Sequence, residues 1–450
     1  MNLLYLSNGY PPLQCAGTEV YTAAIAATFA RAGHRVEVVC SGDWDAGEQA
    51  LNGVTREQHS GVALTRLNLN WTKGPDPNRF LYDNPETEAA LDEYLEQSSP
   101  DLVHITSCYT LSASIIRSVR RHHLPLFITL TDFWFLCPRV TLLRSDGTQC
   151  DGRTTAWECL RCVLARERVY RWPARMLPEA PLGAALTWVS RQPWLSRRRG
   201  LRGLALDMRQ RKATLRSLLE EADGLIAPSR FLAKVYRDNG VQRDIRVVPY
   251  GHDIGWAKDI LPRQVTAPLT FGFMGRITPA KGVHVLIEAL RHLSAELPLR
   301  VDVWGDPRQE ADYVRTLPEL DGGHPPLCFR GHFGREQMAE VFNQIDVLVV
   351  PSVWYENSPL VVHEAFAARK PVIASNLGGL TEAVTHRVNG LVFEPGNARA
   401  LAACLRDLTV HPELISQLRD GILPVKTIQD EVEALTKLYQ TTGAGGGVPS

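Results

Sequence analysis

Two glutamates separated by seven residues, Glu356 and Glu364, lie on either side of a predicted helix start. Before them, Val347–Val350 is a short apolar run of the kind that forms a buried strand in a parallel sheet. Ser358 and Pro359 predict the helix start, because serine is a good N-cap and proline is tolerated at the first helical position. The loop should therefore lie at the carboxyl edge of a sheet, where free amides and the helix dipole favour an anion.

Two more negative charges would weaken an anion site unless the carboxylates accept hydrogen bonds from hydroxyl groups. Sugar hydroxyls are such donors, and so the predicted ligand has phosphate at one end and a polyol at the other, as a nucleotide sugar does. The alternative is that both glutamates are solvated side chains near a helix start, where their charge is favourable. This stretch by itself leaves both interpretations open.

Two other loops contain residues suited to phosphate. The apolar run Phe271–Met274 ends at Gly275, and Arg276 and Lys281 follow on one loop. Guanidinium pairs with phosphate through two hydrogen bonds, and ammonium acts as a point charge. Near the N-terminus, Gly17 begins a predicted amphipathic helix, and a glycine there lets the backbone approach a phosphate closely. An ordinary turn between a strand and a helix would also explain either loop.

Taken together, these motifs resemble those of retaining glycosyltransferases of family GT4, which have the GT-B fold. Glu-x7-Glu, set between a strand with Pro-Ser and a helix, is similar to the family's motif, and Gly275–Gly282 resembles its diphosphate loop. Ala16–Glu19 is similar to its Gly-Gly-x-Glu loop, with Ala16 in place of the first glycine. The resemblance covers almost the whole chain except about residues 137–215.

The resemblance implies a donor site for a nucleotide-diphosphate sugar, a UDP- or GDP-sugar above all, in the second half of the chain. Arg276 and Lys281 would bind the diphosphate and stabilise it as it departs. Glu364 would accept hydrogen bonds from the ribose and Glu356 from the donor sugar. The donor site implied in this way comprises Gly17, Gly275, Arg276, Lys281, Glu356, Ser358, Pro359, Leu360 and Glu364. Such enzymes need neither a protein nucleophile nor a catalytic metal.

Two further candidates for catalysis lie in the first half of the chain. Asp101–His104 resembles the family's strand that ends in a histidine at the cleft, although such a histidine is more often a packed, hydrogen-bonded residue. Related proteins often have His-Asp after the next strand, whereas Thr131 and Asp132 follow it here. Threonine cannot carry charge near neutral pH. Either Asp132 or another group therefore takes over this contact, or the donor sugar differs.

Four of the nine cysteines, Cys137, Cys150, Cys159 and Cys162, form the pattern C-x12-C-x8-C-x2-C. Four thiolates that include a Cys-x-x-Cys pair suit a tetrahedral structural zinc, and an iron–sulfur cluster needs the same ligands. The alternative is four unligated thiols in a turn-rich insertion. We predict a structural metal site, either zinc or iron–sulfur.

The stretch from Arg161 to Arg216 contains 14 basic residues against three acidic ones, and Trp172, Trp188 and Trp194 lie within it. Arginine with tryptophan suits an anionic membrane surface, and the same charge would suit an anionic lipid-linked acceptor or nucleic acid. The alternative is a solvated helical insertion in which the arginines pair locally.

Strand-like and helix-like segments alternate along the chain, which at 450 residues is long enough for two domains. We predict two Rossmann-like domains with parallel sheets that face each other across a cleft. The predicted division is residues 1–248 (with the insertion at about 137–215), 249–427, a helix at 428–442 that crosses back to the first domain, and a disordered tail at 443–450. The predicted strands are Leu3–Ser7, Val36–Cys40, Leu102–Ile105, Leu126–Leu130, Leu269–Met274, Leu299–Trp304, Val347–Val350 and Pro371–Ala374.

Composition narrows the classes of function. Acidic and basic residues are equal at 49 each, so no overall charge favours a nucleic-acid partner. The N-terminus does not resemble a signal peptide, no apolar run is long enough to span a bilayer, and the cysteines do not resemble a secreted disulfide framework. We expect a cytoplasmic protein that also binds the inner face of the membrane as a peripheral protein.

The sequence thus predicts a glycosyltransferase that moves a sugar to the hydroxyl of a sugar or lipid-linked glycan acceptor, in bacterial polysaccharide or glycoconjugate synthesis. One alternative is a GT-B synthase that acts on a soluble small molecule. Another is a non-catalytic basic adaptor with a metal module on a GT-B scaffold.

Overall fold

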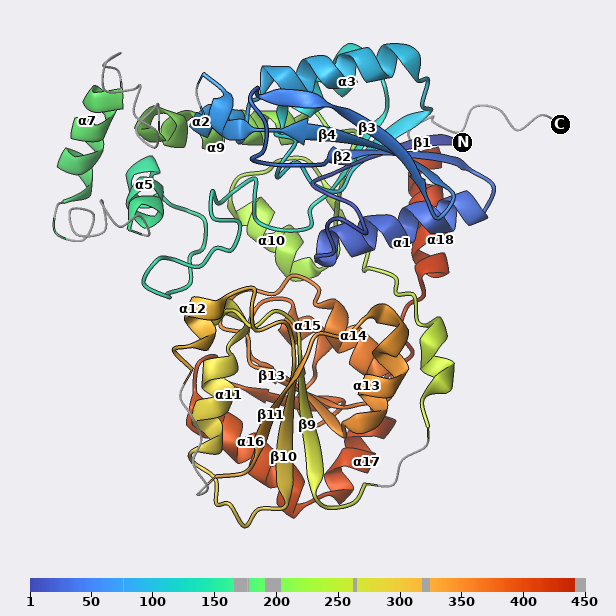
Figure 1. The fold of residues 1–450 in the computed structure, drawn as a ribbon, viewed down its shortest axis with the longest axis vertical. Coiled ribbons are helices and arrows are strands. Elements are labelled where there is room, and N and C mark those ends of the chain that lie inside the picture. Colours follow the sequence, from blue (N-terminus) through green and yellow to red (C-terminus); the bar gives the residue numbers. More distant parts are fainter. Residues whose placement is uncertain are drawn as a thin grey trace. The chain divides into compact units, whose positions relative to one another are not determined.

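The computed structural model describes residues 1–75, 77–165, 176, 178–190, 204–261, 265–317 and 324–441. The chain divides into two compact units, Met1–Pro249 with Ile428–Ser450 and Tyr250–Thr427. Each unit is built around one sheet (Figure 1). The last helix of the chain, which begins at Ile428, belongs to the first unit.

The first unit contains an eight-stranded sheet in the order β3-β4-β2-β1-β5-β6-β7-β8. Neighbouring strands are parallel except at one edge, where β3 and β4 are antiparallel. Its strands are β1 (Asn2–Ser7), β2 (Arg35–Ser41), β3 (Leu51–His59), β4 (Val62–Leu69), β5 (Leu102–Ile105), β6 (Leu126–Thr129), β7 (Gly224–Ala227) and β8 (Ile245–Val247). Its helices are α1 (Gly17–Arg31), α2 (Pro77–Phe80), α3 (Pro85–Gln97), α4 (Ser114–Arg121), α5 (Ala156–Leu164), α7 (Glu179–Ser190), α9 (Leu204–Glu220), α10 (Arg230–Asp238) and α18 (Ile428–Gln440).

The second unit contains a six-stranded, fully parallel sheet in the order β11-β10-β9-β12-β13-β14. Its strands are β9 (Leu269–Met274), β10 (Leu299–Trp304), β11 (Leu327–Gly331), β12 (Val347–Val350), β13 (Val372–Ser375) and β14 (Gly390–Phe393). Its α-helices are α11 (Val283–Leu290), α12 (Ala311–Val314), α13 (Met338–Gln344), α14 (Leu360–Ala367), α15 (Leu380–Ala383), α16 (Ala398–Val410) and α17 (Glu413–Asp420). Short 3-10 turns form at η2 (Gly255–Asp259), η3 (Pro279–Lys281) and η4 (Arg335–Gln337).

Two apolar layers enclose the second sheet. One layer joins the strands to α11, α16 and α17, and the other joins them to α13, α14 and α15. Figure 1 shows α11 and α16 on one side of the strands and α13 and α14 on the other. Because both faces are covered, the strands are continuous apolar runs rather than alternating ones, which is why the sequence pattern located them. Every strand predicted from the sequence is present, with ends that agree within one residue.

The segment after β6 forms a loop region and then α5, α7 and α9, which pack on one another (Figure 1). A Cβ on Gly183 of α7 would lie 2.4 Å from the ring of Trp157 on α5, so the close approach of these two helices requires a glycine there. The predicted disordered tail at 443–450 lies outside the described residues.

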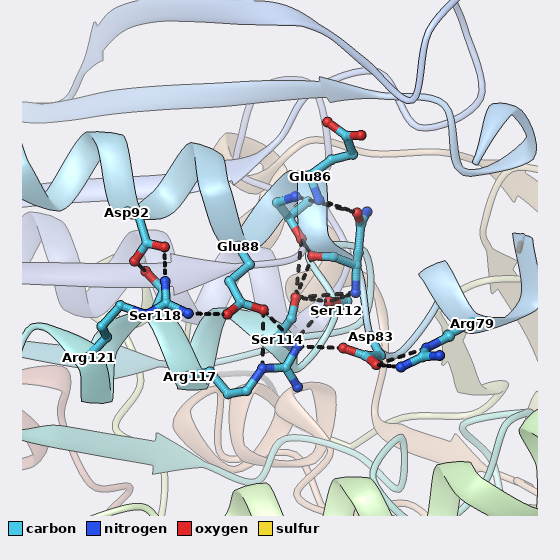
Figure 2. Close-up of polar contacts among 12 residues, drawn as sticks. Arg79, Asp83, Glu86, Glu88, Asp92, Ser112, Ser114, Arg117, Ser118 and Arg121 are labelled. Atoms are coloured by element: carbon cyan, nitrogen blue, oxygen red, sulfur yellow. Dashed lines mark hydrogen bonds and ion pairs between the residues drawn. The ribbon is translucent and has the colours of Figure 1, made fainter. Parts of the chain in front are cut away.

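A network of ion pairs joins α3, α4 and the loop before α3 (Figure 2). Arg117 pairs with Asp83 of the loop and Glu88 of α3, and Arg121 pairs with Glu88 and Asp92 of α3. Exposed pairs contribute little singly, but here each arginine of α4 holds two carboxylates. The network thus joins α4 to α3 and to the loop before it.

His104, predicted as a catalytic candidate, lies in the core of the first unit and is fully buried. Its Nδ1 lies 2.6 Å from the Tyr439 hydroxyl of α18, and its Nε2 lies 2.7 Å from the Thr129 hydroxyl of β6. Burial lowers the pKa of His104 to about 3, so the ring is neutral. Both ring nitrogens are engaged and no solvent reaches them, as in a packed, hydrogen-bonded residue. His104 fastens α18 to the sheet, and its catalytic role stays a prediction.

Replacing Tyr439 by Phe should lower the free energy of unfolding by about 1–3 kcal/mol, because the buried His104 nitrogen loses its partner. Urea unfolding of the variant measures this. Tyr313→Phe is the matched control, since the Tyr313 hydroxyl lies 2.8 Å from His284 Nδ1 at a half-buried site where water can replace it. An equal loss in the two variants would contradict the special role of the buried pair.

Candidate active site

The motif loop of the second unit connects β12 to α14. The structure begins α14 at Leu360, with Pro359 in the cap position and no side-chain hydrogen bond to the helix start. The prediction of Ser358 as the N-cap and Pro359 as the first helical residue is therefore wrong by one position. The first amides of α14 have no side-chain cap, and a helix N-terminus in this state can bind an anion.

Glu356 is the most constrained residue of this loop, with 5% of its surface exposed. Its Oε1 accepts three hydrogen bonds, from Lys281 Nζ at 2.7 Å, from the Ser352 hydroxyl at 2.7 Å and from the Trp354 indole at 2.9 Å. Burial alone would raise the pKa of Glu356, but the charge of Lys281 and these bonds outweigh it and lower the pKa. The carboxylate is thus ionised, and its Oε2 accepts no bond from the described residues.

Trp354 contacts both partners of this pair. Its indole N–H donates to Glu356, and its ring lies 5.3 Å from Lys281 Nζ in a cation–π contact. Sequence reasoning missed Trp354 and Ser352 because the family motif starts at Glu356. A tryptophan two residues before a motif glutamate was the available signal.

Glycines bring the two loops of this pair together. Gly282 has φ +74°, and a Cβ there would lie 1.9 Å from the carbonyl oxygen of Pro351. The Val353 N–H donates to the Ala280 carbonyl at 2.9 Å, which joins the Lys281 loop to the Glu356 loop. Only a residue without a side chain permits this approach.

A second glycine contact supports Glu356 from the other side. The Gly379 N–H donates to the Glu356 carbonyl at 2.6 Å. A Cβ on Gly379 would lie 2.0 Å from the Asn357 carbonyl oxygen, so the Gly378-Gly379 turn packs directly on the motif backbone. The turn therefore positions the motif loop.

Arg276 follows Gly275 on the loop after β9, the same loop that bears Lys281. Gly275 has φ +147°, and its N–H donates to the Trp304 carbonyl at 3.0 Å. The Arg276 side chain is exposed, and within the described part of the chain it makes no ion pair. The structure thus leaves this guanidinium available to a ligand, whereas Lys281 is already paired.

Glu364, the second motif glutamate, is half-buried on α14 and accepts no hydrogen bond from any described residue. Burial raises its pKa to about 7, and the charge of nearby Arg335 only partly opposes this. Arg335 itself pairs with Asp253 at 3.4 Å. Beside Glu364, His363 stacks on His252 with ring centroids 4.5 Å apart. Glu356 and Glu364 are therefore in opposite electrostatic states.

The first unit brings Asp132 close to Glu19. Asp132, half-buried in the loop after β6, accepts a hydrogen bond from the Trp134 N–H at 2.7 Å. Burial raises the pKa of Asp132 to about 6, and the charge of Glu19 adds to the rise. Gly17 begins α1, and a Cβ on it would have no atom within 4 Å. Glu19, which the sequence prediction did not include, is 5% exposed.

The four cysteines of the predicted metal site are free and half-buried. Three of the sulfurs face separate donors: Cys150 accepts from the Gly152 N–H at 3.4 Å and Cys162 from Arg139 at 3.3 Å, while Cys159 lies 3.1 Å from the Thr154 hydroxyl. Among the described residues, no group of three or more His, Cys, Asp or Glu side chains could hold a metal ion. The structure therefore does not support zinc or iron–sulfur at Cys137, Cys150, Cys159 and Cys162.

Much of the basic stretch predicted to bind an anionic membrane lies outside the described residues, including Arg166, Arg168, Arg171, Arg175, Arg191, Arg197, Arg198, Arg199 and Arg202. Within the described part, Arg211 is buried and donates to the Trp134 carbonyl. Lys212 donates to the Gly152 carbonyl at 3.0 Å. These two cations hold α9 to the loop region between β6 and α5. In the ranges that the structure describes, no helix is both long and apolar enough to span a membrane.

The unliganded protein should lose stability as the pH rises from about 4.5 to about 7, through Glu364. Its folded pKa of about 7 lies above the ordinary value, so the folded state binds more protons than the unfolded state in this range. Glu364→Gln should therefore be more stable relative to the wild type at pH 8 than at pH 5. Urea unfolding at both values measures this, with the exposed Glu340→Gln on α13 as a control. A stability difference that is the same at both pH values would contradict the raised pKa.

Comparison with known proteins identifies the family to which the sequence is similar. The sequence matches a family model described as "Glycosyl transferase 4-like domain" over residues 16–251, and one described as "Glycosyl transferases group 1" over residues 268–411. It is 30% identical over 182 residues to the putative glycosyltransferase YtcC of Bacillus subtilis. The aligned region covers 38% of this chain and 44% of that protein. The aligned region thus spans less than half the length of that relative.

Solved structures show the same fold. Sucrose-phosphate synthase from Thermosynechococcus elongatus is similar with a TM-score of 0.66 and 19% identity, over 99% of this chain and 100% of the other. Anabaena HepE, solved in complex with UDP and glucose, is similar with a TM-score of 0.63 and 16% identity, over 98% of this chain and 100% of the other. These likenesses confirm the predicted GT-B class, two α/β domains with parallel sheets. The model of the glycosyl transferase 4-like domain matches more than half of this chain, and so the chain belongs to the glycosyl transferase 4-like family.

Proposed function

We propose that this protein is a retaining glycosyltransferase that moves a sugar from a nucleotide-diphosphate sugar to an acceptor hydroxyl. The observation that carries the proposal is the ion pair of half-buried Lys281 with buried Glu356, beside the uncapped start of α14. A cation, open amides and a carboxylate with one unused oxygen suit a ligand with phosphate and hydroxyl groups. The complex of HepE with UDP and glucose supports a UDP-sugar as the donor, with a GDP-sugar as the alternative.

In this proposal Arg276 and Lys281 bind the diphosphate, and the amides of Ser358 and Leu360 assist. Because Lys281 is already paired, the donor must share it with Glu356. Glu356 then depends on Ser352 and Trp354 to keep its orientation, while its Oε2 accepts a hydroxyl of the donor sugar. Charge on the departing diphosphate grows in the transition state, and so fixed cations stabilise that state more than the bound substrate.

In this proposal Glu364 accepts hydrogen bonds from the ribose hydroxyl groups. A half-buried carboxyl with no donor in the described part of the chain gains most from a ligand that supplies hydroxyl groups. By the family's proposed mechanism, the acceptor attacks on the face from which the diphosphate departs, and the leaving phosphate takes the acceptor's proton. That route retains the anomeric configuration without a protein nucleophile or a catalytic metal.

The proposed acceptor is a sugar or lipid-linked glycan, as in the synthesis of bacterial polysaccharides and glycoconjugates. The first unit, residues 1–248 in the predicted division, would bind it, and residues 249–427 would bind the donor. Arg161 to Arg216 would bring the protein to the inner face of the membrane, through a surface rich in arginine and tryptophan.

Release of nucleoside diphosphate across a panel of UDP-, GDP-, ADP- and dTDP-sugars tests the function directly. We expect release from one donor class, and Lys281→Ala should reduce it by about 10²-fold or more, because a fixed cation at the leaving group is lost. Gly17→Ala should reduce release by roughly tenfold through loss of close backbone approach, although its Cβ meets no protein atom.

The Gly17→Ala variant has its own control. Unchanged thermal unfolding of Gly17→Ala would show that its effect comes from the ligand and not from the fold. The proposal fails if no donor is cleaved and calorimetry detects no binding of any nucleoside diphosphate.

Trp354→Phe should lower kcat by about tenfold and leave the affinity for nucleoside diphosphate within about twofold, because only a charge-assisted hydrogen bond to Glu356 is lost. Phenylalanine keeps an aromatic ring beside Lys281. The pH profile adds a second readout. Loss of the indole hydrogen bond should raise the pKa of Glu356 and so move the acid limb of kcat to higher pH.

Trp256→Phe is the matched control, since the Trp256 indole N–H is buried without an acceptor in the described part of the unit. It should leave turnover unchanged. If Trp354→Phe instead weakened diphosphate binding and left kcat intact, Trp354 would act on the diphosphate and not on Glu356.

A further inference from the structure

A pair of buried side chains in the first unit has hydrogen-bonding capacity that the protein does not use. Asn8 follows β1, and its Nδ2 donates to Glu19 Oε1 at 2.6 Å. Glu19 Oε2 and Asn8 Oδ1 are both buried, and neither has a hydrogen-bond partner among the described residues. Buried polar atoms without partners are rare and costly, and so a group outside the described chain is expected to satisfy these two.

Both unsatisfied atoms are acceptors. A carboxylate only accepts hydrogen bonds, so the amide nitrogen of Asn8 must face Glu19, and its oxygen must face away. Whatever contacts these two oxygens must therefore donate hydrogen bonds. A phosphate cannot do so, and it would also be repelled by Glu19.

The backbone around the pair is firmly held. The Asn8 carbonyl accepts from the hydroxyls of Ser41 at 2.5 Å and Thr110 at 2.7 Å. Glu19 lies in the first turn of α1, where the helix dipole favours a negative charge. The two oxygens are thus presented in a fixed position, as a binding subsite requires.

The surroundings contain charges of both signs. Asp132 lies close enough for its pKa to be affected by the charge of Glu19, and in the described ranges only its Oδ1 accepts a hydrogen bond, from the Trp134 N–H. The α1 amides have no side-chain cap at Ala16, so the positive end of the helix lies beside the two carboxylates. The carboxylates disfavour an anion and the helix end disfavours a cation, and so a neutral ligand is best accommodated.

An exposed aromatic ring completes the surface. Tyr109 is 43% exposed, and after burial the charge of Asp132 is the further cause that raises its pKa, which places the phenol beside that carboxyl. Sites for small polar ligands commonly combine aromatic side chains with a few placed polar groups.

We propose that Asn8, Glu19 and Asp132 form an acceptor subsite that takes hydrogen bonds from the hydroxyl groups of an uncharged sugar, and that it selects against sugars phosphorylated at that position. This proposal rests on the proposed transferase function and names the class of acceptor. These residues are positioning groups for the acceptor, and the proton of the attacking hydroxyl still goes to the leaving phosphate.

The test measures acceptor-stimulated release of nucleoside diphosphate, above the slow release caused by water, with the donor found in the panel. The probes are methyl glycosides of glucose, galactose and mannose, their 6-phosphates, and the methyl glycoside of glucosamine. We expect the neutral glycosides to stimulate release and the 6-phosphates to be at least about tenfold poorer in kcat/KM, because two carboxylates would repel a phosphate.

Glu19→Gln should raise KM for the neutral acceptor about tenfold and leave donor KM and release to water within about twofold, because the lost acceptor acts only on the sugar hydroxyl. Asp132→Asn is a second variant, and it should likewise raise KM for the neutral acceptor about tenfold. The control is Glu86→Gln, which removes an exposed first-turn carboxylate from α3 and so reproduces the change in helix-dipole energy without touching the subsite.

Several results would overturn the proposal. These are equal or better use of the 6-phosphates, a preference for the amino sugar, no stimulation by any probe, or variants with unchanged acceptor KM, as a structural water alone would give. A loss of donor binding in Glu19→Gln would also overturn it. Failure of the transferase function itself differs from all of these, because wild-type protein would then neither bind a nucleoside diphosphate nor release one to water.

Discussion

The buried charge of Glu356 is the constraint on which the second unit depends. Removing a carboxylate from water is costly unless a counter-ion and several hydrogen bonds replace the lost solvent. Lys281, Ser352 and Trp354 supply these, and they come from two different loops. The loops can meet only where their backbones approach closely, and this is the physical reason for the glycine at position 282.

The two glutamates of one motif have opposite electrostatic states, although both are withdrawn from water. Burial would raise the pKa of both carboxyls. At Glu356 the charge of Lys281 and the hydrogen bonds outweigh burial and lower the pKa, whereas at Glu364 burial raises the pKa to about 7. Groups whose environments drive their pKa values apart commonly divide the tasks of a site. Here one carboxylate is ready in the unliganded protein, and the other is completed by the hydroxyls that a ligand brings.

The first unit also contains hydrogen-bonded polar side chains that are withdrawn from water. His104 and Tyr439 satisfy each other in the core and hold α18 to the sheet, so this buried polar pair is structural. Asn8 and Glu19 also bond to each other, but within the described part of the chain each keeps an acceptor oxygen without a partner. Two such oxygens on a bonded pair are what supports the proposed subsite.

Sequence alone determined the fold class, the strands and the donor-site motifs. Buried parallel strands are continuous apolar runs, and motif residues are read directly from their order. It missed the antiparallel edge of β3 and β4, since β3 is largely exposed and has no apolar run. The tertiary structure decided where the side chains lie: Trp354 against Glu356, Asp132 within reach of the charge of Glu19, His104 in the core, and three cysteine sulfurs that face separate donors. Spacing along a chain states which residues are present, but hydrogen bonding and burial depend on the orientation of side chains from distant elements, and only the packed structure specifies that orientation.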